Sequence, residues 1–204
     1  MSIFVVRHAE TDDNARRILQ VPGVPLSSAG RRQAQQLAER LASLGIVKIL
    51  ASDFARTMET ADYVKARTGV DVETEPLLRE RNFGDLRGTA YTALGFDPFA
   101  ADYTPPGGES WAQFHERVAL AWARVASVAG ETKGSLLVIT HGLVCRSLVE
   151  RQLGRTPDEP IPSRWDNTSV TEVDAIPPWT LRRVNCTMHL GSADRPLGRH
   201  GGAA

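Results

Sequence analysis

Short apolar segments alternate along this chain with longer segments in which apolar residues recur at helical spacing. The short segments are mainly apolar runs of four to six residues, at 2–6, 47–51, 70–73 and 135–140. Runs of this length and character are typical of strands buried in a sheet. Strands that alternate with helices favour a parallel sheet covered by helices on both faces. We therefore expect an α/β fold, a three-layer α/β/α sandwich with a mostly parallel central sheet.

Helices are predicted between these strands by apolar periodicity and by capping residues. Ser110 and Gln113, three residues apart, form a capping box at the start of the longest helix. Ser27 and the pair Ser52-Asp53 are the expected N-caps of two others, and glycines follow most of these segments, as is common at helix ends. The predicted helices lie at 28–44, 54–68, 111–129 and 142–153, with a short polar helix or turn at 12–17.

The remaining segments complete a single expected domain over 1–190. Residues 169–174 and 179–184 are predicted to form an antiparallel pair of strands. Residues 82–108 are rich in glycine, proline and scattered aromatic residues, which predicts a long functional loop or small lid. The Gly-, Arg- and Ala-rich end at 191–204 is expected to be a disordered tail.

Composition narrows the possible partners. The chain has 204 residues, enough for one full-sized core, and its 24 Lys and Arg balance its 24 Asp and Glu. This balance argues against nucleic acid and against a membrane surface as partners. No apolar run of roughly 18 residues and no charged-then-apolar leader is present, so we expect a cytoplasmic protein. Cys145 and Cys186 have no metal-type spacing and are expected to be buried free thiols.

Basic residues and histidines stand where the predicted strands end. Arg7 and His8 come directly after the first strand, and His141 with Gly142 directly after the strand at 135–140. Arg56 lies near the start of the helix that follows the second strand. In open α/β sheets, ligands bind at the carboxyl ends of the strands. Arginine forks suit phosphate or carboxylate groups, so these residues predict one shared anion-binding site.

The same residues suit phosphoryl transfer. A neutral histidine is a competent nucleophile toward phosphorus, and the transition state needs charge neutralisation more than covalent help. A carboxylic acid such as Glu80 can protonate the departing oxygen if its pKa is raised. Gln20 precedes Pro22 in a loop and is a candidate for lining the site.

Seven motifs in chain order carry these residues. They are Arg7-His8-Ala9-Glu10-Thr11 with Asn14; Leu26-Ser27 with Gly30; Ser52-Asp53 with Arg56-Thr57 and Thr60-Ala61; Leu78, Glu80 and Phe83-Gly84 with Gly88; Gly107-Gly108-Glu109-Ser110; Thr140-His141-Gly142; and Asn167-Thr168-Ser169-Val170. In this order they resemble the histidine phosphatase superfamily, also called phosphoglycerate mutase-like, and its phosphatase branch in particular. A single Arg-His pair is weak evidence, whereas seven ordered motifs are specific.

The resemblance implies a role for each matching residue. His8 would be the phosphorylated nucleophile, and Glu80 the general acid that later activates water. Arg7, Arg56 and His141 would hold the phosphoryl oxygens.

Two further positions belong to the implied phosphate-binding set, Asn14 and Gly142. The family needs no metal and no cofactor, because arginines supply the charge neutralisation that a metal ion would otherwise provide. The first family motif usually reads Arg-His-Gly, and here Ala9 replaces the glycine.

The implied activity is that of a metal-independent phosphomonoesterase, which takes a small-molecule phosphomonoester and releases inorganic phosphate. The alternative is a phosphoglycerate-type mutase. Mutases of this superfamily carry a longer insertion between the acid and the second histidine, and tend to have tryptophan where Asp13 stands here. Both differences favour a phosphatase. A non-catalytic phosphate-sensing protein is the third alternative, and the complete set of expected catalytic residues argues against it.

The aromatic residues of 89–106 are expected to select the leaving group. Tyr91, Phe96, Phe99 and Tyr103 lie in this segment, which carries little charge. These residues favour a substrate whose leaving group is a ring-bearing or modest-sized alcohol, and disfavour a polyanionic substrate. The sequence leaves the oligomeric state open. A homodimer that pairs through an exposed edge strand is one possible state.

Overall fold

The computed structural model describes residues 1–156, 160–191 and 194. Within these residues, six strands form one sheet, and the first four of them in spatial order are parallel. The fifth runs antiparallel to its neighbour, and so does the sixth. The spatial order is β3 (Val72–Thr74), β2 (Ile46–Ala51), β4 (Ser135–Thr140), β1 (Ser2–Arg7), β5 (Val170–Asp174) and β6 (Leu181–Cys186).

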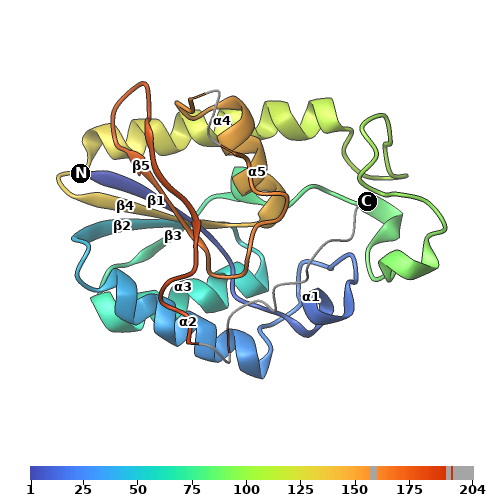
Figure 1. The fold of residues 1–204 in the computed structure, drawn as a ribbon, viewed down its shortest axis with the longest axis horizontal. Helices are drawn as coiled ribbons and strands as arrows, with labels where there is room; N and C mark the ends of the chain where they lie inside the picture. The colour runs from blue at the N-terminus through green and yellow to red at the C-terminus, as the bar shows by residue number, and fades with distance from the viewer. Residues whose placement is uncertain (157–159, 192–193, 195–204) are drawn as a thin grey trace.

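Helices cover both faces of this sheet, and the expected three-layer sandwich with a mostly parallel sheet is confirmed. Figure 1 shows α4 and α5 on one face and α2 and α3 on the other, with the short α1 near the edge where the parallel strands end. The bounds are α1 Asp12–Arg16, α2 Ser28–Leu41, α3 Ala55–Thr68, α4 Trp111–Glu131 and α5 Gly142–Arg151.

Alternation along β1 divides the core into two halves. Ile3 and Val5 belong to the cluster that packs under α4 and α5, whereas Phe4 and Val6 belong to the cluster under α2 and α3. Successive strand side chains point to opposite faces, so a central strand covered by helices on both sides is apolar throughout. All four side chains are at most 5% exposed. The apolar run therefore fixes β1 in the middle of the molecule, and Arg7 at its end.

The expected antiparallel pair of C-terminal strands is present, displaced along the chain by one or two residues. The expected N-cap of α3 is wrong. Its N-cap is Phe54, with no side-chain cap. Ser52 Oγ is instead 2.9 Å from His141 Nε2, a long-range contact that local capping preferences do not reveal.

Residues 82–108 form a long loop, as the sequence predicts, and two 3₁₀ turns lie within it, Gly84–Leu86 and Tyr91–Ala93. A third, Pro76–Leu78, precedes it. Arg81 holds this loop in place through hydrogen bonds to its backbone. Arg81 is 1% exposed as a whole residue, and its guanidinium donates hydrogen bonds to three backbone carbonyls and lies 4.0 Å from the centre of the Trp111 ring. Burial of a charge requires such complete pairing. The loop is thus packed onto α4.

The C-terminal segment returns to α2. Asp194 accepts a hydrogen bond from Arg32 Nη2 at 2.9 Å, and the Gly191 amide donates to Gln36. The rest of the predicted tail lies outside the described residues. Both cysteines are free, but only Cys145 is buried, and Cys186 is partly exposed, which corrects the expectation for that thiol. Among the described helices, none is long and apolar enough to cross a membrane.

Candidate active site

The carboxyl ends of three parallel strands bring the predicted residues together. The backbone of His8 donates to the Thr140 carbonyl at 2.9 Å, so the residues that follow β1 and β4 lie side by side. The Ser52 amide, just after β2, likewise donates to Ile139 at 3.0 Å. The His8 and His141 rings are 5.2 Å apart between centres. The two histidines therefore belong to one site.

The His8 imidazole is held in one tautomer. Its Nδ1 lies 2.7 Å from the Ala9 carbonyl oxygen, which only accepts, so Nδ1 carries the proton. Its Nε2 accepts a hydrogen bond from Arg56 Nε at 3.2 Å and therefore holds the lone pair. Burial, together with the charges of Arg56 and Arg7, holds the pKa of His8 well below its usual value. His8 is consequently neutral near pH 7, and its Nε2 lone pair, now the acceptor for Arg56, can attack only when a ligand takes over that hydrogen bond.

Ala9, which replaces the usual glycine, fits without crowding. Its methyl group is fully buried in a small cluster with Leu26 and Ala34, and its amide donates to Thr60 Oγ1 at 3.1 Å. The extra methyl fills apolar space beneath the nucleophile and leaves the backbone carbonyl free to hold Nδ1.

Two arginines flank the nucleophile. Arg7 donates through Nη1 to the carbonyl of Trp165, while its Nε is buried without a hydrogen-bond partner among the described residues. Arg56 Nη1 donates to the Val21 carbonyl at 3.2 Å, and burial lowers the pKa of Arg56 to about 10. The guanidinium groups remain cationic near neutral pH, and an unpaired buried donor is costly unless a ligand satisfies it. The site is therefore built for an anion.

His141 adds a neutral donor. Ser52 Oγ lies 2.9 Å from Nε2, and Nδ1 is buried with no partner among the described residues. Burial holds the pKa of His141 well below its usual value, and the charge of Arg56 lowers it further. In the tautomer that carries the proton on Nδ1, the Ser52 hydroxyl donates to Nε2 and Nδ1 is a donor without a partner among the described residues, like Arg7 Nε.

Gly142 lies directly against Arg7. A Cβ at this position would be 3.5 Å from Arg7 Nε, an ordinary contact distance. Gly142 is also the first residue of α5, whose N-cap His141 makes no side-chain cap. The amides of a helix N-terminus attract negative charge, so α5 adds to the positive potential at this site.

Glu80 lies next to these cations and is partly exposed. Its carboxylate accepts hydrogen bonds from the amides of Arg81 at 3.0 Å and Leu143 at 3.3 Å. Burial raises the pKa of Glu80 above its usual value, although these amides and the charges of Arg56 and Arg7 oppose the rise. Such a carboxyl group keeps its proton to higher pH than an ordinary glutamate, as a general acid requires.

Asn14 and Gln20 stand at the edge of the site and are bound through Thr11. Asn14 Oδ1 accepts from the Thr11 amide at 3.2 Å, and Thr11 Oγ1 donates to Gln20 Oε1 at 2.9 Å. Asn14 Oδ1 also accepts from Asn167 Nδ2, which donates to the His8 carbonyl at 3.0 Å. Within the described chain, the side-chain nitrogens Asn14 Nδ2 and Gln20 Nε2 donate no hydrogen bond, whereas the Asn14 backbone amide donates to Thr11 Oγ1. The two side-chain nitrogens remain available to a ligand.

Some contributors to this site are invisible in the sequence. The Trp165 carbonyl that receives Arg7 belongs to a residue that no motif includes, because any residue supplies a carbonyl. Asn167 belongs to the last of the seven motifs, but only the fold shows that its side chain donates a hydrogen bond to the His8 carbonyl. Within the described residues, no group of three or more His, Cys, Asp or Glu side chains is placed to hold a metal ion.

A buried neutral histidine, two arginines and unsatisfied donors at strand ends define a site suited to a phosphoryl group. The sequence model of the histidine phosphatase superfamily (branch 1) matches residues 3–187. The chain belongs to that superfamily.

Relatives in sequence carry the names of phosphoglycerate mutases. Phosphoglycerate mutase-like protein 4 of Arabidopsis thaliana is 39% identical over 163 residues, which cover 73% of this chain and 70% of that protein. A probable phosphoglycerate mutase, GpmB of Proteus mirabilis, is 34% identical over 184 residues, which cover 85% of each chain.

Solved structures of the same fold include a phosphatase and a phosphoglycerate mutase. A mycobacterial glucosyl-3-phosphoglycerate phosphatase in complex with VO3 has a TM-score of 0.77 at 26% identity, over 91% of this chain and 99% of that one. A phosphoglycerate mutase from Bacillus anthracis has the same TM-score at 25% identity, over 91% and 92% of the two chains.

Proposed function

We propose that this protein hydrolyses a small phosphomonoester through a phosphohistidine on His8. The observation that carries this proposal is the state of His8: it is neutral, fixed through Nδ1 to the Ala9 carbonyl, and its Nε2 lone pair faces Arg56. A nucleophile in a fixed orientation beside a cation loses little freedom on reaching the transition state. A phosphate-sensing protein would need the two arginines but no oriented lone pair.

In the first step, His8 Nε2 attacks phosphorus and an N–P bond forms. The ester P–O bond breaks, its electron pair goes to the leaving oxygen, and Glu80 delivers a proton to that oxygen. The phosphorylated imidazole is positively charged, and its Nδ1–H still donates to the Ala9 carbonyl, which stabilises the charge. Glu80 is left as a carboxylate beside the intermediate.

In the second step, the Glu80 carboxylate takes a proton from a water molecule, whose oxygen attacks phosphorus. The N–P bond breaks, its electron pair returns to His8, and inorganic phosphate leaves. The raised pKa of Glu80 suits this exchange of roles, because the group must be protonated in one step and ionised in the next.

The arginines and His141 stabilise the charge on the phosphoryl oxygens throughout. Arg7 Nε and His141 Nδ1 already lack partners among the described residues, so a phosphoryl oxygen satisfies them without displacing another bond. Preorganised donors of this kind act strongly where water is excluded. Asn14 and Gln20 would contact the substrate from the edge of the site, and Gly142 would leave room for the phosphate beside Arg7.

The proposal is tested by phosphate release from an aryl phosphate in the presence of EDTA, with His8→Ala as the comparison. We expect full activity with the chelator and a loss of at least about 1,000-fold in the variant, since a covalent nucleophile has no substitute. When the reaction is quenched without acid, mass spectrometry should detect an added phosphoryl group on the peptide that contains His8. Loss of wild-type activity with EDTA would sink the metal-free mechanism.

A phosphoglycerate-type mutase is the second candidate, favoured by the names of the relatives in sequence. A mutase returns the phosphoryl group to product before water reaches it. The phosphatase predicts steady phosphate release from a monophosphate alone. The mutase predicts isomerisation that depends on a bisphosphate primer, with little phosphate released.

A further inference from the structure

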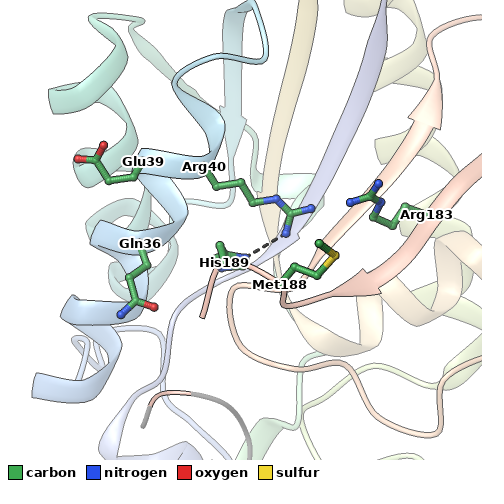
Figure 2. Close-up of a pocket in the computed structure, with 6 residues that line it drawn as sticks. All are labelled: Gln36, Glu39, Arg40, Arg183, Met188 and His189. Atoms are coloured by element: carbon green, nitrogen blue, oxygen red, sulfur yellow. Dashed lines mark hydrogen bonds between the residues drawn. The ribbon is translucent and has the colours of Figure 1, made fainter. Parts of the chain in front are cut away.

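A second cluster of cations lies beside α2, apart from the residues assigned to catalysis. A surface cavity of about 470 Å³ opens between α2 and the segment after β6. Figure 2 shows the side chains around it, with Arg40 and Arg183 extending toward one another above Met188. The lining residues are Gln36, Glu39, Arg40, Arg183, Met188 and His189.

Neither arginine of this cavity has a carboxylate partner within the described residues. Arg40 donates to the Cys186 carbonyl at 3.1 Å and lies 3.0 Å from His189 Nδ1, both neutral acceptors. Arg40 Nη2 and Arg183 Nη1 both approach Cys186 Sγ, at 3.4 Å and 3.9 Å. Two guanidinium groups thus lie close to one sulfur atom.

The one carboxylate that lines the cavity is neutralised elsewhere. Glu39 Oε2 accepts a hydrogen bond from Arg67 Nε at 3.0 Å. Figure 2 shows the Glu39 carboxylate turned away from Arg40. The two arginines therefore leave the cavity with an excess of positive charge, which raises the local concentration of anions.

His189 contributes no third charge. Arg40 Nη1 can only donate, so His189 Nδ1 accepts and Nε2 carries the proton, which points to Thr168 Oγ1 at 3.2 Å. Burial lowers the pKa of His189 to about 4, and the charge of Arg40 lowers it further. The Thr168 amide in turn donates to the Arg7 carbonyl at 3.0 Å. The cavity thus carries two charges near neutral pH and is linked by hydrogen bonds to the backbone of the catalytic strand.

We infer that this cavity binds a phosphate group, either as inorganic phosphate or at the end of a phosphomonoester. A dianion matches the two charges, and arginine forks suit phosphate oxygens geometrically. The volume admits a small organic group beyond the phosphate, with Met188 as its apolar contact. This second site stands whether or not the protein is a phosphatase, because it uses none of the catalytic residues.

Cys186 provides a local probe of occupancy. Its thiol accepts from both arginines, and these bonds, with one from the Met188 amide, lower its pKa against the opposing effect of burial. Bound phosphate would take over the arginine donors, raise the pKa of the thiol and cover it. Iodoacetamide, which is neutral, should then alkylate Cys186 more slowly. Cys145 is 1% exposed and serves as the internal reference for global opening.

The experiment measures the alkylation rate of each cysteine peptide by mass spectrometry while inorganic phosphate is raised at constant ionic strength with chloride. We expect Cys186 to slow by about threefold or more, with saturation at millimolar phosphate, in keeping with a weak, partly exposed ion-binding site. An unchanged rate up to saturating phosphate in the wild type would overturn the inference.

Variants separate this site from the catalytic one. Arg183→Gln should abolish the protection and leave inhibition of turnover by phosphate unchanged. Arg182→Gln is the matched control, because Arg182 is the adjacent residue and pairs with Asp174 at 2.7 Å. It should keep the protection. Protection that persists in Arg183→Gln would overturn the inference, and Arg40→Gln provides an independent repeat.

The two sources of phosphate are distinguished in a His8→Ala background, where a monoester is not consumed. If only inorganic phosphate slows the alkylation of Cys186, the ligand of the cavity is the free ion. If only glycerol phosphate slows it, the ligand is a phosphomonoester. Protection by both assigns the shared phosphate group. No protection by either, in a variant that retains native circular dichroism, would contradict the site.

Discussion

Two places in this molecule combine arginine with histidine in nearly the same contact. At the candidate active site, Arg56 Nε donates to His8 Nε2 at 3.2 Å. Beside α2, Arg40 Nη1 donates to His189 Nδ1 at 3.0 Å. In both pairs burial and the neighbouring arginine lower the pKa of the histidine, so that it is neutral near pH 7.

The two pairs differ in burial and in unsatisfied donors. Arg56 and His8 are each 2% exposed, and unpartnered buried donors lie next to them on Arg7 and His141. Arg40 and His189 are half-buried, and within the described chain neither has an unpartnered buried atom. Charges act more strongly where water is excluded. We therefore propose catalysis at the buried pair and only weak binding at the half-buried one.

The largest expected difference concerns the arginines themselves. Arg56→Gln should lower kcat/KM by about 1,000-fold, or about 4 kcal/mol, because a buried donor to the transition state is lost. Arg40→Gln should change kcat/KM by less than about twofold, since this arginine does not reach the reacting group. Steady-state kinetics on an aryl phosphate measures both, with circular dichroism as the control for folding. Equal losses in the two variants would erase the distinction.

Glu80→Gln should produce the next largest effect, and one that depends on the leaving group. General acid catalysis contributes about 100- to 10,000-fold, and it matters most for alcohols that leave poorly without a proton. We expect a loss of about 100-fold or more with an alkyl phosphate and a much smaller loss in the first step with an aryl phosphate. Single-turnover kinetics with both substrates checks this. An equal loss with both would remove Glu80 as the acid.

The state of Glu80 also sets the direction of a pH effect. Its pKa is raised, so the carboxyl group stays protonated to higher pH than a free glutamate. With an alkyl phosphate, cleavage needs the proton and should decline as pH rises through this pKa. This decline, the alkaline limb of the pH–rate profile, should disappear in Glu80→Gln. A pH–rate profile for the first step that keeps the same alkaline limb in the variant would assign the limb to another group.

The sequence was sufficient to predict that the candidate site residues lie together, because several of them follow apolar strands directly. A strand end has a sequence signature, and the topology of parallel strands places such ends together. Arg7, His8 and His141 could therefore be grouped before any coordinate was known. Arg56 was grouped with them from its place near a helix start, the family motifs supported Glu80 as the acid, and the structure brings both to the same edge.

Contacts between distant, ordinary-looking residues could not be predicted. Ser52 has the local character of a helix cap, yet its hydroxyl contacts His141, 89 residues away. Arg40 lies on the polar side of a helix, and nothing in its surroundings indicates that it meets His189, 149 residues further on. Such pairs have no periodicity or fixed spacing, since they depend on how α2 packs against the segment after β6.

The buried histidines should make stability depend on pH. His8 and His141 have lowered pKa values in the folded state, so only the unfolded chain takes up their protons just below an ordinary pKa of 6.5. Stability should therefore be fully present above about pH 6.5 and fall by about 1.4 kcal/mol per pH unit for each such histidine below it. Their charged neighbours are Arg7 and Arg56 for both histidines, with Arg117 also acting on His141.

Urea unfolding at pH 7.5, 6.0 and 5.0 measures this dependence. His141→Asn should reduce the slope of the free energy of unfolding against pH by the amount that one proton taken up on unfolding contributes. Comparison of the two proteins cancels the contribution of the carboxylates, which both retain. Parallel pH dependences in wild type and variant would show that His141 is protonated equally in the folded and unfolded chains.

The smallest expected effect concerns the two arginines beside α2, half-buried Arg40 and exposed Arg183. Arg40 and Arg183 approach the same sulfur atom without a carboxylate partner among the described residues, so they repel one another. Arg183→Gln should therefore stabilise the protein by about 0.3 kcal/mol at low salt, an increment that salt or phosphate screens away. Arg182→Gln removes a charge that is paired with Asp174 and should give no such gain. Urea unfolding of the three proteins at low and high salt measures the difference. If Arg183→Gln destabilises the fold at low salt, the two guanidinium groups do not repel, and the contrast between the buried cluster at the strand ends and the cluster beside α2 loses its electrostatic basis.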